Sequence, residues 1–241
     1  MDIKEEEEIK KEFQLERVVL FSDAVFAIII TIMVIEIKLP EGLRHQSHEK
    51  VREAFIELLP KFAGYISAFF LVAVFWTKHL RIFSYLKDYT KQLIIFNLIF
   101  LFFISLFPFG VSLMTETISP KNFEGLFIYI GIVMLASMTQ TLLIWYLIRN
   151  AKTLCIRPAE IERNLEWKAQ RFNFIAIPVL LLYVAVITAN HYGPNAYTVG
   201  FIIWAAVVSL VRKKFYPKQN TDGPMLARLF RSRKAKPADT E

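Results

Sequence analysis

The sequence predicts an all-α fold: a polytopic membrane protein with six transmembrane helices. Of its 241 residues, 55% are hydrophobic, and the mean hydropathy is +0.40. Soluble domains usually contain about 45–50% apolar residues. The excess lies in continuous blocks and not on one face of amphipathic segments, which excludes an ordinary soluble globule. Leu, Ile, Val and Phe are also too plentiful for a disordered chain.

Six apolar segments are long enough to cross a hydrocarbon core, which needs about 20 helical residues. They lie near residues 18–39, 58–78, 92–115, 124–148, 172–190 and 196–211. The first is rich in β-branched residues but too long for a strand, and lipid requires each spanning segment to satisfy its own backbone, so we expect helices. Pro108 predicts a kink or an end in the third segment, and Pro178 a bend in the fifth. The sixth follows a Gly193-Pro194 turn, which predicts a tight hairpin.

Basic residues orient these segments. They gather after the second segment, after the fourth and after the sixth, whereas Lys121 is the only base between the third and fourth. The connection over 39–57 has three bases, but four glutamates balance them. Counting positive charges therefore puts both termini in the cytoplasm, as an even number of helices requires. We expect a cytoplasmic segment over 1–17, a transmembrane domain over 18–214 and a basic cytoplasmic tail over 215–241.

The net charge of +7 needs no nucleic-acid partner, because the positive residues flank apolar blocks. The start of the chain, MDIKEEEEIKKEFQLER, is acidic, unlike a secretory signal, and predicts a solvated helix leading into the first span. The basic tail is expected to be attracted to the lipid surface. Cys155 is the only cysteine, which excludes an intrachain disulfide.

Several polar residues lie inside the apolar segments. Asp23 is about five residues into the first helix, roughly 8 Å below the interface, where an acid needs a partner. The predicted topology brings further polar side chains to the same depth, in the cytoplasmic third of the membrane. We expect a network of Arg17, Ser22, Asp23, Trp76, His79 and Asn97 that joins the first helix to the second and third.

Two interpretations of this network remain open. Polar side chains commonly bind transmembrane helices together, and we favour that role over a proton relay. A zinc or iron site is not expected, because the chain offers one imidazole, His79, at this depth and no Cys-rich or His-rich motif. Catalytic motifs and Gly-rich phosphate loops are also absent, so we expect neither an enzyme nor a cofactor.

The first helix carries Arg17-x-x-x-Phe21-Ser22-Asp23 followed by AVFAIIITIMVIEI. This run resembles the first-helix motif of the transmembrane protein 175 potassium channels. Phe75-Trp76-x-x-His79 in the second segment, and Asn97 with Leu106-x-Pro108-Phe109 in the third, are similar to later parts of that family's pattern. A single six-helix unit resembles the prokaryotic members, which assemble as homotetramers. The resemblance implies a potassium channel in a bacterial or archaeal cell membrane, with potassium ions, lipid and further copies of the chain as its partners.

The resemblance also implies that the first helix lines the pore. Ile28, Ile32 and Ile35 are spaced i, i+4, i+7 and share one helical face. Four copies would form stacked isoleucine rings that exclude ions by dewetting when closed. In a slightly wider ring, potassium passes more easily than sodium because it sheds water more readily. The family match favours Ile28 and Thr31 as the selectivity pair, with Ile32 and Ile35 completing the constriction.

The first helix and the function of the chain also allow other interpretations. An isoleucine stripe is ordinarily a lipid-facing or packing surface, and isoleucines occur on nearly every face of this helix, so periodicity alone does not choose the pore face. Glu36 fits an external cation attractor or a headgroup-level acid equally well. A proton-coupled transporter using Asp23 and His79 as a relay is the alternative function, although no inverted repeat is detectable. A membrane-embedded enzyme is the third hypothesis.

Overall fold

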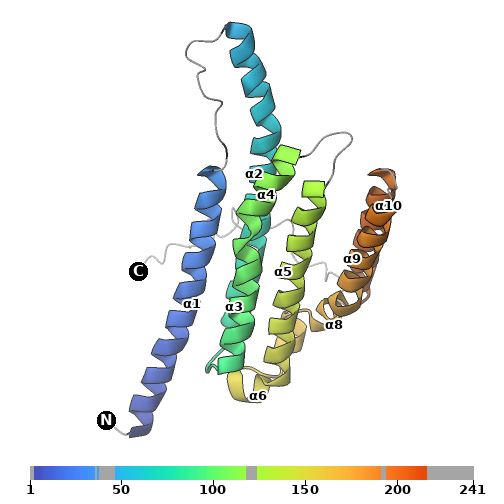
Figure 1. Cartoon of the computed structure of the whole chain (residues 1–241). Coiled ribbons are helices and arrows are strands. Elements are labelled where there is room, and N and C mark those ends of the chain that lie inside the picture. The colour runs from blue at the N-terminus through green and yellow to red at the C-terminus, as the bar shows by residue number, and fades with distance from the viewer. Residues whose placement is uncertain (1–2, 36, 38–46, 118–123, 191–193, 216–241) are drawn as a thin grey trace, which may run out of the picture.

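The computed structural model describes residues 3–35, 37, 47–117, 124–190 and 194–215, and within them the chain is helical without strands (Figure 1). The long helices are α1 (Ile3–Ile35), α2 (His48–Phe83), α3 (Lys91–Ser105), α4 (Phe107–Thr117), α5 (Glu124–Arg149), α9 (Asn173–Ala189) and α10 (Pro194–Phe215). Three one-turn helices lie between α5 and α9: α6 (Ala151–Leu154), α7 (Ile161–Asn164) and α8 (Trp167–Gln170). The predicted all-α class is therefore confirmed.

Five stretches of the described chain are long and apolar enough to cross a membrane. They are Ile9–Ile35, His48–Phe83, Lys91–Thr117, Glu124–Arg149 and Trp167–Ile187. The sixth predicted segment forms a 22-residue helix, α10, which packs against α9. A sixth crossing by α10 remains a prediction. The predicted hairpin turn lies partly outside the described residues, but Pro194 does begin α10.

The prediction for the second segment was too short. We expected a helix over 58–78 after a loop over 39–57, yet α2 begins at His48 and has 36 residues. Hydropathy detects only its apolar part, whereas the first turns alternate charged and apolar residues as an amphipathic helix does. Pro60 lies inside this helix without ending it. The upper part of α2 consequently protrudes beyond the other helices (Figure 1).

Pro108 interrupts the third segment as predicted. The segment divides into α3 and α4 at Leu106, where the backbone N–H of Leu106 donates to the carbonyl of Phe103 instead of that of residue 102. A proline ring clashes with the carbonyl four residues earlier and lacks an N–H, but the first turn of a new helix tolerates both. The second residue of α4 is therefore a favourable place for Pro108.

The helices pack around two main apolar cores. The first joins α1, α2, α3, α4 and α5, and its fully buried side chains include Phe26, Val72, Phe100 and Phe107. α1 contacts α2, α3 and α4, while α5 contacts α3, α4 and α9. α10 contacts α9 and α8. α1 thus lies at one edge of the molecule and the α9–α10 pair at the other (Figure 1).

The second core lies at one end of the bundle and ties two loops together. Leu86 and Cys155 form an isolated antiparallel bridge, in which Lys87 N–H donates to Leu154 and Ile156 N–H donates to Tyr85, both at 2.9 Å. Leu86 is itself buried, and Leu147, Leu154 and Ile161 are buried in the same core. We call the α2–α3 connection together with α6 and α7 the platform.

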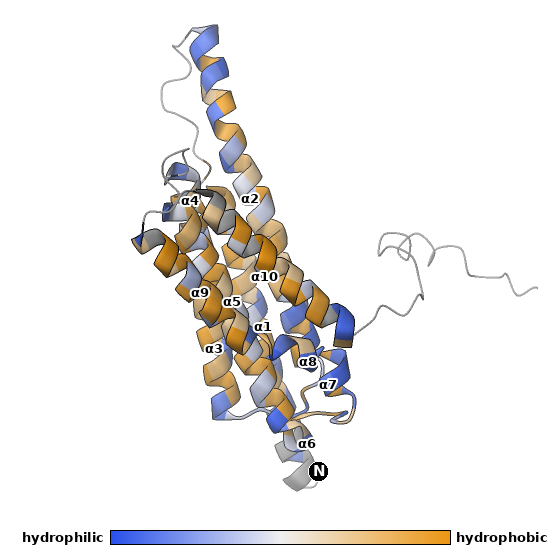
Figure 2. Ribbon diagram, turned by 90° about the vertical axis from the view of Figure 1, so that its right-hand side faces the viewer, coloured by the Kyte–Doolittle hydropathy of each residue, from blue (hydrophilic) through white to orange (hydrophobic). Residues whose placement is uncertain are grey.

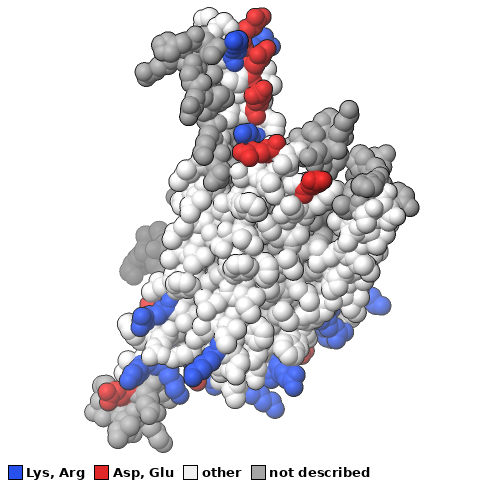
Figure 3. All heavy atoms as spheres, viewed as in Figure 1, with Lys and Arg blue, Asp and Glu red and all other residues white. Residues whose placement is uncertain are grey.

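Charge and hydropathy follow the long axis of the molecule. Apolar residues dominate the middle of the bundle (Figure 2), and on the face shown in Figure 3 Lys and Arg gather near the platform. The opposite end carries Glu side chains mixed with Lys and Arg along the protruding part of α2 (Figure 3). We call the platform end the basic end.

The expected boundary between a cytoplasmic segment (1–17) and the transmembrane domain does not coincide with a break in the helix. α1 continues from Ile3 to Ile35 through the junction between residues 17 and 18. The acidic start of the chain, from residue 3 onward, and the first apolar segment are therefore one helix. At the other end of the chain α10 ends at Phe215, and the tail beyond it lies outside the described residues.

Candidate functional site

One face of α1 is buried in the molecule. Ser22, Phe26, Ile29 and Met33 recur at spacings of four, three and four residues, and each is at most 4% exposed. This spacing places them on one side of a helix, where they pack against α2, α3 and α4. Ile29 is therefore a core residue of this fold.

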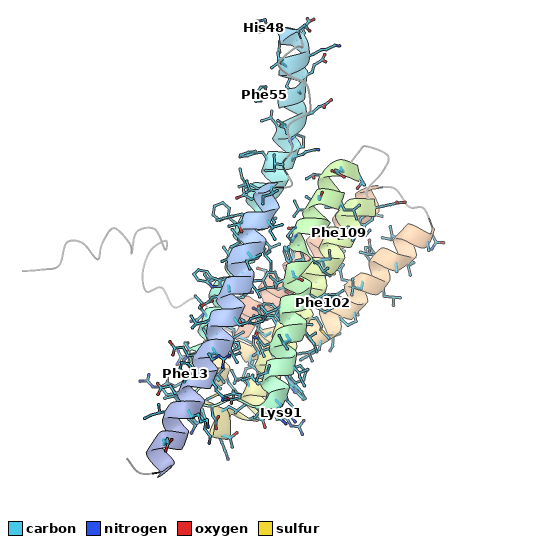
Figure 4. All side chains as sticks on the ribbon, turned by 60° about the vertical axis from the view of Figure 1, so that its left-hand side comes forward. Phe13, His48, Phe55, Lys91, Phe102 and Phe109 are labelled. Carbon is cyan, nitrogen blue, oxygen red and sulfur yellow. The ribbon has the colours of Figure 1, made fainter. Side chains whose placement is uncertain are left out.

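The opposite face of α1 carries the four predicted pore residues. Ile28 is 55% exposed, Ile32 40% and Ile35 67%, and Thr31 is exposed between them. From Ile28 to Ile35 the stripe rises about 10 Å along the helix axis. In Figure 4 α1 lies in front of the other helices, and side chains along its length point away from them. The fold thus distinguishes two faces that isoleucine periodicity did not.

Thr31 adds a polar atom to this stripe. Its Oγ1 donates to main-chain carbonyls of the preceding turn, with Ile28 O at 2.8 Å and Ala27 O at 3.0 Å. Since the single hydroxyl hydrogen points at the helix backbone, the oxygen lone pairs remain on the exposed side. Thr31 can therefore present an acceptor oxygen within one turn of Ile28 and Ile35.

Three of the predicted polar residues form a buried chain. Asn97 Nδ2 donates to Ser22 Oγ at 2.9 Å, and Ser22 Oγ donates to Val18 O at 2.9 Å. Asn97 Oδ1 lies 2.8 Å from His79 Nε2, and because this oxygen can only accept, His79 Nε2 carries the proton. Ser22, His79 and Asn97 are at most 1% exposed. This chain joins α1, α3 and α2.

Aromatic rings hold His79 in place. Its ring stacks on Phe83 with centroids 4.2 Å apart, and on Phe100 at 5.8 Å with an interplanar angle of 11°. Phe26 covers a third side at 5.7 Å. An imidazole enclosed in this way is rigid, which suits a residue that binds helices together.

Asp23 and Trp76 form a separate pair. Trp76 Nε1 donates to Asp23 Oδ1 at 2.9 Å, which links α1 directly to α2. An indole has one donor and no acceptor, so it cannot pass a proton from the carboxylate toward His79. No hydrogen bond between described residues joins this pair to the Ser22–Asn97–His79 chain.

Arg17 does not join either group. Its side chain is exposed and lines an open pocket of about 360 Å³ between α1 and α3, together with Gln14 and Tyr89. Among the described residues it makes no ion pair with Asp23. Arg17 and Asp23 lie six positions apart on α1, which places them on different sides of the helix.

The sequence analysis missed a second polar group in α5. Thr139, Gln140 and Thr141 are buried, and Gln140 Nε2 reaches the carbonyl of Phe75 at 3.4 Å. Thr141 Oγ1 accepts from Asn173 Nδ2 at 3.0 Å, which ties α5 to the start of α9. Three consecutive polar residues inside the fourth apolar segment were the signal that could have found them.

The described residues contain no group of three or more His, Cys, Asp or Glu side chains that could hold a metal ion. Glu36, expected at the outer end of the first helix, lies outside the described residues. The arrangement on α1 therefore consists of an apolar stripe with one hydroxyl, fixed in the fold by the polar pairs on its other side.

The profile of the family described as endosomal/lysosomal potassium channel TMEM175 matches residues 17–108. A potassium channel of Chryseobacterium sp. strain P1-3 is 30% identical over 197 residues, which cover 80% of this chain and 91% of that protein. A potassium channel of Chamaesiphon minutus is 29% identical over 78% of this chain and 82% of the relative.

A vertebrate relative is longer. The endosomal/lysosomal proton channel TMEM175 of Danio rerio is 23% identical over 86% of this chain, but the match covers only 40% of the fish protein.

Among solved structures, the crystal structure of a lysosomal potassium-selective channel TMEM175 homolog from Chamaesiphon minutus superposes with a TM-score of 0.60. That match has 21% sequence identity and covers 84% of this chain and 98% of the other, so it shows a shared fold.

Proposed function

The chain belongs to the TMEM175 family, and from that premise we propose that it is a potassium-selective channel, a homotetramer in which four α1 helices line one central pore. The bacterial relatives are named potassium channels and are covered over most of their length. The apolar helices make it a multi-pass membrane protein of a channel family, not of an enzyme family.

The observation that carries the proposal is the two-faced α1. One face is fixed in the core through Phe26, Ile29 and Met33, while Ile28, Ile32 and Ile35 are left uncovered at the edge of the molecule. A helix with this division can present its apolar stripe to an axis without giving up its packing. The polar pairs of Ser22 and Asp23 fix the rotation of α1 that this requires.

The stripe supports a simple mechanism of gating and selection. Rings of Ile28, Ile32 and Ile35 exclude water and ions when they are narrow, because an ion in an apolar constriction loses its hydration without replacement. When the rings widen slightly, potassium enters more readily than sodium, since it holds its water less tightly. Thr31 supports this selection by offering hydroxyl oxygens beside the Ile28 ring in partial exchange for lost water. Potassium is thus the permeant ion, and no cofactor is required.

The alternative, a proton-coupled transporter with Asp23 and His79 as a relay, has less support. Asp23 is paired with an indole that cannot accept a proton, and His79 is enclosed by three aromatic rings. The same contacts favour a role in holding α1 to α2 and α3.

The basic end supports an orientation with both termini in the cytoplasm of a cell membrane.

The test is the reversal potential of the purified full chain in a planar bilayer, with potassium on one side and sodium on the other. We expect unitary current steps and a bi-ionic reversal potential at which the potassium side is negative relative to the sodium side, as a higher permeability to potassium requires. Absence of unitary steps would overturn the channel proposal in favour of a carrier. A reversal potential that instead follows an imposed pH gradient would overturn potassium selectivity.

A further inference from the structure

A groove lies at the basic end, below the part of α1 that is proposed to line the pore. It has a volume of about 830 Å³ and runs between the lower part of α1 and the platform. On the α1 side it is lined by Glu12, Leu15, Glu16 and Val19, and on the platform side by Leu86, Asp88, Thr153 and Ile156, among others. The proposed function assigns this groove no role.

The groove combines an apolar floor with a charged rim, in which Glu12, Glu16 and Asp88 outnumber Lys11 and Lys87. Leu15 and Val19 are half-buried at its base, and Ile156 is 62% exposed at its edge. Glu12 and Glu16 are four residues apart and share one face of α1. Asp88 adds a third carboxylate on the platform, 4.0 Å from Lys11. The surface therefore favours a partner that is apolar on one side and basic on the other.

The chain itself contains such a partner. Residues 225–236, MLARLFRSRKAK, carry five basic residues and no acidic one, whereas residues 1–16 carry seven acidic and three basic residues. Met225, Leu226, Leu229 and Phe230 recur at a spacing that gives one apolar face to a helix, with Arg228 and Arg231 beside them. Both the charge and the apolar pattern of this segment complement the groove.

The connection to α10 limits the reach of this segment. α10 ends at Phe215, after the basic residues Lys213 and Lys214, and nine residues separate it from Met225. Nine extended residues span at most about 30 Å, comparable to the diameter of a small domain. Residues 225–236 can therefore reach a groove that lies within about 30 Å of Phe215, on the same chain or on a neighbouring copy.

We propose that residues 225–236 dock in the groove between α1 and the platform, with their arginines on Glu12 and Glu16 and their apolar side chains on Leu15, Val19 and Ile156. Because α1 continues without a break to Ile28, the docked segment clamps the lower end of the helix that we propose lines the pore. This regulatory consequence rests on the proposed function, but the docking itself does not.

Disulfide trapping in the full chain tests the docking without any measurement of current. In a Cys155→Ser background, Thr153→Cys in the groove is combined with Ser232→Cys in the tail, and the protein is held in nanodiscs of neutral lipid. The control replaces Thr153→Cys by Glu160→Cys, an exposed position between α6 and α7 that does not line the groove. We expect the groove pair to cross-link about tenfold faster, because docking raises the effective concentration of the tail at that site.

Charge dependence separates docking from random collision. Glu12→Gln with Glu16→Gln should slow the groove cross-link to the control rate, whereas Glu49→Gln with Glu53→Gln, a matched pair on α2 at the other end, should not. Raising the salt from about 0.1 M to about 1 M shortens the screening length from about 10 Å to about 3 Å and should also slow it. A bond within one chain or between two copies supports the proposal alike, since the same segment fills the same groove.

Two results would overturn it. Equal cross-linking of the groove and control pairs in neutral lipid would show that the tail does not select the groove. Loss of the difference when about a third of the lipid is anionic would show that the tail prefers the membrane surface, as basic segments commonly do. Neither result would bear on whether the protein conducts potassium.

Discussion

The indole of Trp76 donates a 2.9 Å hydrogen bond to the carboxylate of Asp23, and this bond joins α1 to α2 within an apolar segment. A carboxylate at this depth is costly without a partner, and an indole N–H buried without an acceptor also costs free energy, though less than the charge does. The pair therefore couples the position of α1, and with it the exposed Ile28 stripe, to the rest of the bundle.

This pair gives a first prediction. Asp23→Ala and Trp76→Phe should each lower the thermal stability of the protein in detergent, and the double variant should be less destabilised than the sum. We expect a coupling of about 1 kcal/mol, as for other hydrogen bonds between membrane helices. Asp23→Asn, which keeps an acceptor oxygen, should retain most of the stability. Strict additivity of the two single variants, with normal assembly of Asp23→Ala, would refute the role of the pair in holding α1.

The exposed stripe gives a second prediction. Ile28→Asn should wet the proposed constriction, raise the unitary conductance and reduce the preference for potassium over sodium, because an amide supports water where isoleucine excludes it. Ile95→Asn on α3 is a matched control, since Ile95 is 54% and Ile28 55% exposed. Bi-ionic reversal potentials measure both. An unchanged reversal potential in Ile28→Asn would remove Ile28 from the selectivity element.

The close approach of α4 and α5 gives a third prediction. A Cβ added at Gly125 would lie 2.5 Å from the carbonyl oxygen of Leu113, a backbone atom that cannot move aside easily. Gly125→Ala should therefore lower the free energy of unfolding by about 1–3 kcal/mol through overpacking. Gly131→Ala in the same helix meets no atom within 4 Å and should be neutral. Thermal unfolding of the two variants compares them directly, and equal midpoints would contradict the packing argument.

Cys155 gives a fourth prediction, which concerns pH. Burial raises the pKa of its thiol to about 11, with Lys87 opposing the shift. A raised pKa keeps the thiol protonated at neutral pH, so only roughly a thousandth is thiolate at pH 8, and maleimide labelling should rise about tenfold per pH unit toward pH 11. Ile156→Cys in a Cys155→Ser background, at an exposed neighbouring position, should label rapidly at pH 8. Rapid labelling of native Cys155 at that pH would show that the bridge with Leu86 opens readily.

Local patterns predicted much of the fold. The ends of α5 and α9 lie within one residue of the expected segments, and Pro108 interrupts the third segment as a proline ring should. The predicted start of α2 was wrong. Its first turns are helical, but they carry too many charged residues to be recognised by hydropathy. It also passed over α6, α7 and α8, whose single turns carry no periodic signal.

The candidate site was predicted as a set of residues, not as an arrangement. Asn97, His79 and Ser22 do meet, but Asp23 accepts its hydrogen bond from Trp76 and Arg17 lies apart in an open pocket. Depth in the membrane follows from counting residues along each helix. The rotation of one helix relative to another depends on how their side chains interlock. It therefore cannot be predicted by counting residues along a single segment.

The sequence by itself determined that the chain is helical, that its apolar segments are of membrane length and that its positive charge gathers at one end. These properties are local, because a backbone in lipid must close its hydrogen bonds within each segment. Only the tertiary structure decided that Ile29 is buried while Ile28 is exposed, and that a groove opens between α1 and the platform. Those features arise where segments distant in sequence pack together. The apolar faces of α1 are nearly equivalent in composition, so the packing decides which of them is left uncovered.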